Sequence, residues 1–211
     1  MAGAVKRRYQ SERRREQARQ TRDRVLEAAA ALFAERGYDA TSVAAIAESA
    51  GVADETVYSH FGNKRTLLGE LMQAAVRGSD PRPVPEQDAP RALATSRDRR
   101  EQLHLFADDV SQRLQRAAPL VAVVAAAARS EPELADLYGR LHADRLRNLR
   151  ILVDALGANG PLALPAAEAV ETVWALTSPE LHQLLTDVRG WSRARYVRWL
   201  ESSLAALLLV D

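Results

Sequence analysis

The chain has 211 residues, and its hydrophobic fraction of 47% and charged fraction of 27% are ordinary for a soluble globular protein. It contains no cysteine, which excludes a disulfide framework and thiolate metal sites. No window supplies about 18 uncharged apolar residues, so we expect no membrane span. The charged N-terminus lacks the apolar core of a secretory signal, so we expect a cytoplasmic protein.

Motifs for catalysis or metal binding are missing from the sequence. The four histidines, at positions 60, 104, 142 and 182, form no close metal-ligand pair. The sequence has no GxSxG, no Walker loop and no HExxH. Acids such as Asp108 and Asp109 fit a solvated helix face more simply than a catalytic pair. We therefore expect neither an enzyme nor a bound cofactor or metal.

Positive charge is concentrated at the N-terminus. Residues 1–24 carry nine Lys or Arg and three Asp or Glu, whereas the whole chain has a net charge of only +1. Such a tail suits DNA phosphates or the minor groove, and the alternative is a disordered tail that aids solubility. Interspersed Glu12 and Glu16 indicate that part of it extends the first helix. The basic residues of this arm are Lys6, Arg7, Arg8, Arg13, Arg14, Arg15, Arg19 and Arg22.

Helical periodicity begins near Thr21 and continues through a short two-helix motif. Val25, Ala29, Leu32 and Phe33 share one helix face, which Gly37 ends. Thr41 has the residue type of an N-cap for a second helix over the following apolar residues. Gly51 then supplies a turn, and a third short helix ends at the aromatic Phe61. Two short helices around a glycine turn are typical of a helix-turn-helix, whose second helix enters the DNA major groove.

The rest of the chain also shows helical patterns. A fourth helix is predicted over 64–76, and a proline-rich stretch then predicts a surface loop over 78–95 and a domain boundary. Helical pattern resumes near Ser96, and Pro119 is predicted to start a separate apolar helix over 120–128. Later helices are expected to start at Pro132, Pro165, Pro179 and Ser192. No alternating strand pattern is evident, so the fold class is predicted to be all-α.

The residues of the two-helix motif carry a resemblance to a known family. The match to that family runs in one register without gaps, at Gly37-Tyr38, Thr41, Ile46-Ala47, Ala50-Gly51-Val52, Thr56, Tyr58, His60-Phe61, Lys64 and Leu67-Leu68. On these residues the segment 21–70 resembles the tetracycline-repressor (TetR) family of bacterial transcription regulators. The run from Trp174 to Leu181, with Arg189-Gly190-Trp191, is similar to a C-terminal segment of many members.

The resemblance implies an all-helical homodimer with a three-helix DNA-binding domain and a larger effector-binding and dimerisation domain. Members usually repress by occupying a palindromic operator and release this DNA when a small molecule binds. We accordingly expect a basic arm over 1–20, a DNA-binding domain over 21–66 and an effector-binding domain over 67–211. The helices over 165–189 and 192–209 are the expected dimer contact, although their apolar faces also suit an intramolecular core.

Residues of the motif divide into expected phosphate contacts and expected base contacts. The resemblance places Thr56, Tyr58 and His60 at positions that often touch the DNA backbone, and Lys64 and Thr41 suit phosphate oxygens. Asp54, Glu55 and Ser59 are the candidate base readers, with Val57 as a contact for a thymine methyl. Ala53 stands where the family usually has a Ser N-cap. Asp54 is therefore expected to cap the helix instead, which starts it one residue later.

Candidates for the effector site are aromatic and histidine side chains on the later apolar helices. An apolar cavity with a few polar groups is the usual form of a small-molecule site, so the expected effector is small and largely apolar or aromatic. Each candidate has ordinary core or surface packing as its alternative. The alternative functions are a ligand-binding helical dimer without DNA binding and, with less support from the sequence, an enzyme. The candidates are Phe106, Tyr138, His142, Trp174 and His182.

Overall fold

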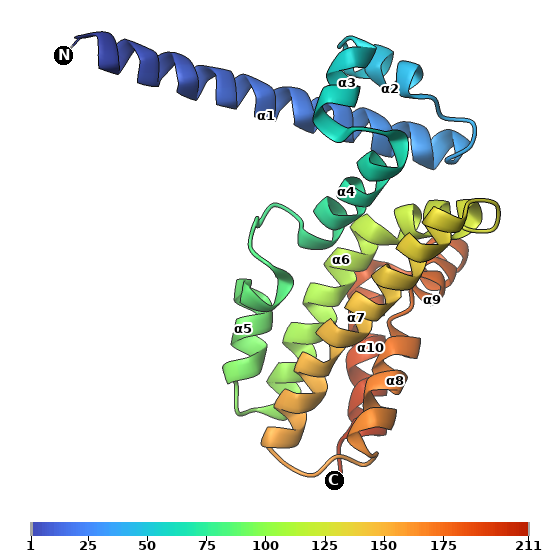
Figure 1. The fold of residues 1–211 in the computed structure, drawn as a ribbon. Helices are drawn as coiled ribbons and strands as arrows, with labels where there is room; N and C mark the ends of the chain where they lie inside the picture. Colours follow the sequence, from blue (N-terminus) through green and yellow to red (C-terminus); the bar gives the residue numbers. More distant parts are fainter. Residues whose placement is uncertain (1, 211) are drawn as a thin grey trace. The chain divides into compact units, whose positions relative to one another are not determined.

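The computed structural model describes the backbone of residues 2–210 and the side chains of residues 13–210. The prediction of an all-α fold is confirmed (Figure 1). Within the described residues, β pairing is limited to an isolated bridge between Leu162 and Leu209. No helix there is both long and apolar enough to cross a bilayer. The chain forms two compact units, Met1–Leu71 and Met72–Asp211.

The first unit is built on a long helix against which the two-helix motif packs. Helix α1 spans Ala2–Arg36, α2 spans Val43–Ala50 and α3 spans Asp54–Phe61. Helix α4, Lys64–Arg77, begins in this unit. Helix α1 starts well before the predicted Thr21, and the prediction from Glu12 and Glu16 that part of the basic arm extends this helix is confirmed. The fully buried side chains of this unit include Phe33, Ile46, Leu67 and Leu68.

The second unit is a helical bundle in which the long helices α6 and α7 run side by side (Figure 1). Buried Leu103, Leu152, Val173, Tyr196 and Leu200 belong to one core shared by α6, α7, α8 and α10. The elements that follow α4 are η1 (Val84–Glu86), α5 (Asp88–Thr95), α6 (Arg99–Ala127), α7 (Pro132–Ala158), α8 (Ala166–Leu176), α9 (Pro179–Gln183), the π-helical turn η2 (Leu184–Val188) and α10 (Arg193–Leu208).

Two sequence predictions about prolines are corrected. The predicted loop over 78–95 ends in helix α5, whose first turn accommodates Pro90 because an N–H there has no helical partner. Pro119 does not start a new helix but lies inside α6. Its missing N–H leaves the Gln115 carbonyl without a helical partner, and both residues lie on the exposed side of the helix. Water can therefore satisfy that carbonyl, and the helix continues.

Candidate DNA-binding surface and ligand cavity

The turn between α2 and α3 has the geometry of a helix-turn-helix. Gly51 adopts φ 66° and ψ 42°, the left-handed conformation that glycine tolerates best, and its amide bonds back to the last turn of α2. The amide nitrogen of Val52 donates to the Ala47 carbonyl at 3.0 Å, which closes the turn. The sequence prediction of a glycine turn at this position is confirmed.

The N-cap of α2 is Ser42 and not Thr41 as predicted. Ser42 Oγ accepts from the amide of Ala45 at 3.1 Å. The Thr41 side chain is only 1% exposed, and its hydroxyl donates toward the carbonyls of Leu32 and Gly37 at 3.2 and 2.7 Å. Thr41 therefore holds α1 against the start of α2, and its hydroxyl cannot reach phosphate in this conformation. The exposed Ser42 lies at that helix end instead.

Helix α3 starts without a side-chain cap. Ala53 occupies the N-cap position with φ −76° and ψ 153°, and no side chain bonds to the free amides there. The prediction that Asp54 caps the helix is wrong, because Asp54 is the first helical residue. Asp54 and Glu55 both lie in the first turn, where their charges favour the positive end of the helix dipole.

One face of α3 is exposed and the other is anchored in the core. Asp54, Glu55, Tyr58 and Ser59 are exposed, and the Tyr58 side chain is an unusually accessible aromatic at 52%. Val57 is only 2% exposed and packs inward, so its predicted contact with a thymine methyl is corrected. Phe61 is buried, as predicted, while Thr56 and His60 lie half-buried at the edges of the exposed face.

Two cations predicted to meet phosphate make contacts within the first unit. Lys64 Nζ donates to the Tyr38 carbonyl at 2.9 Å and lies 3.9 Å from the centre of the Tyr38 ring. Arg22 lies 4.7 Å from the centre of the Phe61 ring and pairs with Glu70. Both residues thus hold helices of this unit together, and a phosphate contact would be an additional role for either.

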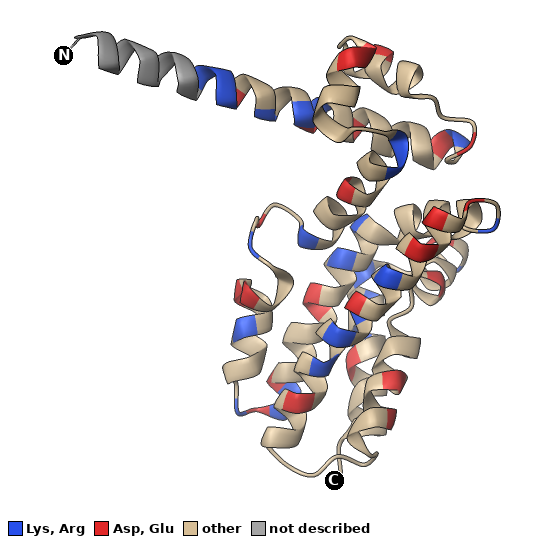
Figure 2. Cartoon of the chain, viewed as in Figure 1, with Lys and Arg blue, Asp and Glu red and all other residues tan. Residues whose placement is uncertain are grey.

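The part of α1 that precedes its buried segment carries exposed basic residues (Figure 2). Arg13, Arg14, Arg15 and Arg19 are all exposed, and Arg19 pairs with Glu16 at 2.7 Å one turn away. Such a surface pair contributes little to stability. This segment therefore presents a helical row of cations. The side chains of Lys6, Arg7 and Arg8, also predicted for the arm, lie outside the described residues.

The second unit contains a cavity of about 540 Å³, within the usual range for a small-molecule site. Its wall comes from the end of α4, the loop before α5, and helices α5, α6 and α7. Of the five predicted ligand residues, Phe106 and His142 line it, while Tyr138, Trp174 and His182 do not. Apolar side chains dominate the wall, among them Met72, Val76, Leu105, Val110, Leu149 and Ile151.

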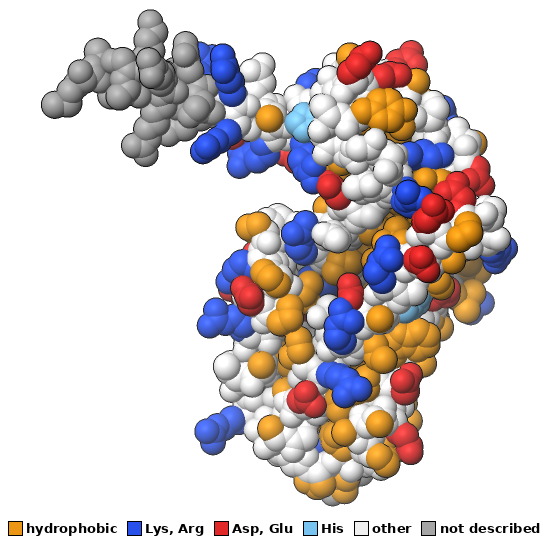
Figure 3. Space-filling view, in the orientation of Figure 1, with side chains coloured by type: hydrophobic (Ala, Val, Ile, Leu, Met, Phe, Trp, Pro, Cys, Tyr) orange, Lys and Arg blue, Asp and Glu red, His pale blue; other side chains and the backbone are white. Residues whose placement is uncertain are grey.

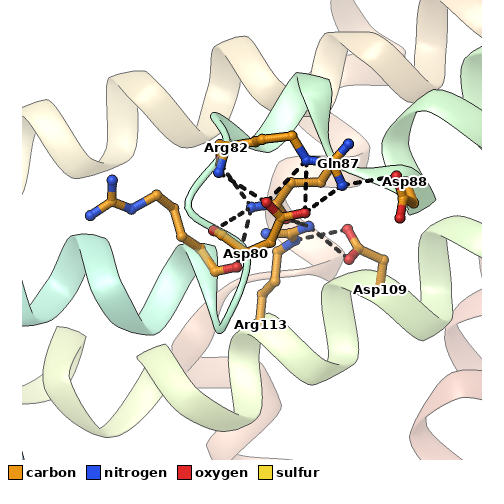
Figure 4. A network of polar contacts seen from close by, with 7 residues as sticks. Asp80, Arg82, Gln87, Asp88, Asp109 and Arg113 are labelled. Carbon is orange, nitrogen blue, oxygen red and sulfur yellow. Dashed lines mark hydrogen bonds and ion pairs between the residues drawn. The ribbon is translucent and has the colours of Figure 1, made fainter. Parts of the chain in front are cut away.

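A polar network fixes the loop side of this cavity (Figure 4). The buried amide of Gln87 donates to the carbonyls of Arg77, Asp80 and Arg82. Its oxygen accepts from Arg113 Nη2 at 2.8 Å. Arg113 also makes two 2.8 Å contacts to the Asp109 carboxylate. The sequence analysis missed this network, because Gln and Arg in a proline-rich, charged stretch look like surface residues.

Further polar contacts strengthen the same loop. Arg113 Nη1 donates to the Val76 carbonyl at 2.7 Å, and Arg116 Nε donates to the Ala75 carbonyl at 2.9 Å, which satisfies the last turn of α4. Arg82 pairs with Asp80 and Asp88 at 2.6 and 2.8 Å. Hydrogen bonding to Arg82 lowers the pKa of Asp80, so the carboxylate stays ionised.

Aromatic and histidine side chains next to the cavity form a connected group. The rings of Tyr138 and His142 meet edge-on at 4.3 Å, and His142 lies 5.6 Å from the Trp174 ring. His182 packs edge-on against Tyr196 at 4.9 Å and is only 6% exposed. Three predicted ligand residues, Tyr138, Trp174 and His182, are thus packed around the cavity-lining His142 and the nearby core. Burial lowers the pKa of both His142 and His182, so both rings are neutral at pH 7.

Comparison with known proteins places the two-helix motif in a family. Residues 25–71 match the family model described as "Bacterial regulatory proteins, tetR family". A segment of 52 residues is 46% identical to the HTH-type transcriptional repressor KstR2 of Mycobacterium tuberculosis. Over residues 25–71 the chain is therefore similar to regulators of the TetR family. That match covers 25% of this chain and 26% of KstR2, so it spans about a quarter of the relative's length.

The TetR-family fold extends over nearly the whole chain. The structure of NalD, the secondary repressor of the MexAB-OprM multidrug efflux pump in Pseudomonas aeruginosa, superposes with a TM-score of 0.66 at 26% identity. That match covers 90% of this chain and 97% of NalD. The TetR-family transcriptional regulator PfmR from Thermus thermophilus has a TM-score of 0.62 at 23% identity, covering 87% and 96%. The second unit therefore also has the fold of these regulators.

Proposed function

We propose that this protein is a DNA-binding transcriptional regulator that represses by occupying an operator and leaves it when a small molecule fills the cavity. The observation that carries the proposal is the one-sided exposure of α3. Asp54, Glu55, Tyr58 and Ser59 face solvent, while Val57 and Phe61 anchor the helix. This arrangement gives an anchored helix whose free face carries polar side chains suited to reading the major groove. KstR2 and NalD are both named as repressors, which supports the direction of regulation.

The acidic start of α3 shapes the expected DNA contacts. Asp54 and Glu55 repel phosphate but can accept hydrogen bonds from cytosine amino groups. Tyr58 and Thr56, together with the exposed Ser42, offer hydroxyl donors for phosphate. The row of exposed arginines on α1 supplies the positive charge that the acidic helix lacks. Base readout by α3 and charge neutralisation by α1 are therefore separate contributions.

A mobility-shift titration tests the proposal on the DNA upstream of the protein's own gene. The Tyr58→Phe variant removes one exposed hydroxyl and should weaken operator affinity about tenfold if that hydroxyl meets phosphate. Tyr138→Phe removes a matched hydroxyl in the second unit and should leave operator affinity unchanged. If the wild-type protein gives no shift at low salt, DNA binding is lost and the ligand-binding dimer becomes the better description.

We also propose a homodimer that pairs through α8, α10 and the turn between them. Leu184, Val188 and Leu207 are exposed apolar side chains at 51%, 73% and 45%. Hydrophobic side chains also reach the surface of the second unit over the region of α8 (Figure 3). Exposed apolar surface of this kind marks interaction sites. A dimer would place two copies of α3 on half-sites about 34–36 Å apart, or on a spacing adjusted to the operator.

Light scattering at micromolar concentration tests the dimer. The Leu207→Glu variant should shift the mass to that of a monomer, because it places a charge in the buried interface. Ala126→Glu, an exposed position on α6, is the matched control and should remain dimeric. A wild-type monomer under these conditions would contradict the proposal.

A further inference from the structure

Four buried polar atoms without hydrogen-bond partners lie beside the cavity, where α7 packs against the later helices. They are His142 Nδ1, Arg145 Nη1, His182 Nδ1 and Tyr196 Oη. Buried polar groups are nearly always paired, so an unpaired group needs an explanation. His142 and Arg145 also line the cavity, which places unsatisfied hydrogen-bonding capacity in the wall of a mostly apolar chamber.

Arg145 is held in place but is not neutralised. Its Nη2 donates to the Trp174 carbonyl and to Thr177 Oγ1, the latter at 2.8 Å. The guanidinium carbon lies 5.1 Å from the centre of the Trp174 ring. These contacts orient the guanidinium group but supply no negative charge.

The other cations of the cavity wall differ from Arg145. Arg113 pairs with Asp109 at 2.8 Å, Arg147 pairs with Asp144, and Arg77 is exposed to solvent. Within the described part of the chain, Arg145 has no carboxylate oxygen within 4 Å. Burial lowers its pKa to about 10, so it remains a cation at pH 7. A half-buried cation without an acid is costly, and a bound anion would offset that cost.

Glu180 is the acid whose charge acts on Arg145, and it leaves the anion site open. Glu180 is exposed, and one of its oxygens accepts from the Tyr138 hydroxyl at 3.5 Å. Water screens an exposed carboxylate, so its attraction for Arg145 is weak. The other titratable groups facing Arg145 are Tyr138, Tyr196 and His142. The tyrosines are neutral at pH 7, and burial raises both pKa values further above their ordinary value.

We propose that the cavity binds an amphipathic organic acid, with its apolar body against the α5–α6 wall and its carboxylate at Arg145 beside His142. This inference rests on the proposed effector role of the cavity and names the chemical class of the effector. Arg145 Nη1 is covered by protein atoms, so the acid reaches it after a rotation of the arginine side chain. The neutral His142 ring then offers a second donor if its proton is on the nitrogen that faces the acid.

An amphipathic acid matches both the apolar and the charged side chains of the cavity wall. Leu105, Phe106 and Leu149 present apolar surface to the body of the ligand. Arg145 supplies positive charge and an unused hydrogen-bond donor, from which a carboxylate gains more on binding than a neutral ester does. Charge-assisted hydrogen bonds to a guanidinium are among the strongest that a ligand can make in such a site. The Arg145–His142 end therefore sets the specificity of the cavity, and the apolar wall contributes most of the affinity.

Isothermal titration calorimetry on the full-length protein, without DNA, tests the proposal with matched probes. Dodecanoate and naphthoate are compared with their methyl esters and with the dodecyltrimethylammonium cation. At least one acid should bind about tenfold or more tightly than its ester and the cation. Failure of both acids to bind, or equal binding of acid and ester, would overturn the proposal. This comparison uses only the wild-type protein, so it does not depend on the folding of a variant.

Two variants locate the acidic group. Arg145→Gln should remove the preference for acid over ester. Arg147 is an exposed cation in the same wall, so the control variant Arg147→Gln should retain that preference. An unchanged preference in Arg145→Gln would contradict the placement of the carboxylate. Because no DNA is present, acid binding together with a failed mobility shift would reject only the DNA-binding proposal. A normal shift without acid binding would reject only the inference about the ligand.

Discussion

Replacement of Gln87 by leucine should lower the free energy of unfolding of the second unit more than substitution of an exposed residue does. The side chain is only 5% exposed, and its amide nitrogen lies 3.2, 3.3 and 2.9 Å from the carbonyls of Arg77, Asp80 and Arg82. Leucine has a similar volume and leaves these carbonyls without their donor. It also removes the acceptor for Arg113 Nη2. The substitution therefore isolates the polar role of Gln87 from its packing.

The magnitude follows from counting hydrogens and charges. The amide has two N–H groups for three carbonyls, so about two neutral hydrogen bonds are lost, at about 0.5–1.5 kcal/mol each. The bond from Arg113 involves a charged donor, but Arg113 keeps Asp109 and the Val76 carbonyl, so its loss is only partial. The expected decrease in the free energy of unfolding is about 2–4 kcal/mol.

Urea unfolding monitored by tryptophan fluorescence measures this decrease for the second unit. The three tryptophans, Trp174, Trp191 and Trp199, all lie in the second unit, so the signal does not include unfolding of the first. Gln112→Leu is the matched control, because exposed Gln112 makes a single side-chain bond to Asp108. The control should change the free energy of unfolding by less than about 0.5 kcal/mol. Equal values for the two variants would refute the role assigned to Gln87.

Three further predictions concern the cap, the arm and a buried histidine. Ala53→Ser should raise the free energy of unfolding of the first unit by about 0.5–1 kcal/mol in thermal or urea melts, with Ala53→Gly as the smaller control, because serine supplies the acceptor missing at the start of α3. Deleting residues 1–18 should flatten the dependence of operator affinity on salt in filter-binding assays, and an unchanged slope would mean that the basic residues of the deleted segment do not meet phosphate. The second unit should lose stability as pH falls below 6.5, the ordinary pKa of histidine, because burial lowers the pKa of folded His182 and the unfolded chain therefore takes up protons first. The loss of stability should continue until the pH is low enough for folded His182 to protonate as well. Urea midpoints across this pH range should be less pH-dependent in the His182→Gln variant than in the wild type. An identical pH profile in the two proteins would argue against the buried ring as the cause.

Periodicity predicted the helical elements well, because an apolar stripe at helical spacing needs no knowledge of its partner. The glycine turn at Gly51 was equally predictable, since few other residues tolerate its backbone conformation. The cap of α2 was not predictable, because Thr41 and Ser42 are adjacent and both carry hydroxyls. The folded structure assigns the cap to Ser42, because Thr41 is buried against α1 and Ser42 Oγ accepts from the amide of Ala45.

The cavity was predictable only in part. Aromatic and histidine residues on apolar helices drew attention to Phe106 and His142, which line it, but equally to Trp174 and His182, which pack beside it. The sequence spacing could have indicated Arg145 as a cavity residue, because it lies three residues after His142 and thus one turn along the same face of α7. Its lack of an acid depends on side chains far away in sequence, so only the folded arrangement reveals it.

The two ends of the cavity differ in how freely they can change during evolution. On the loop side, Arg113 already satisfies Asp109, Gln87 and the Val76 carbonyl, so a substitution there disrupts several contacts at once. On the α7 side, His142 and Arg145 each retain an unpaired atom, so a new polar partner can be gained there at the loss of fewer existing contacts. Relatives of this protein should therefore diversify their effectors by substitutions along α7, and engineered sensors for other acids should be sought there first.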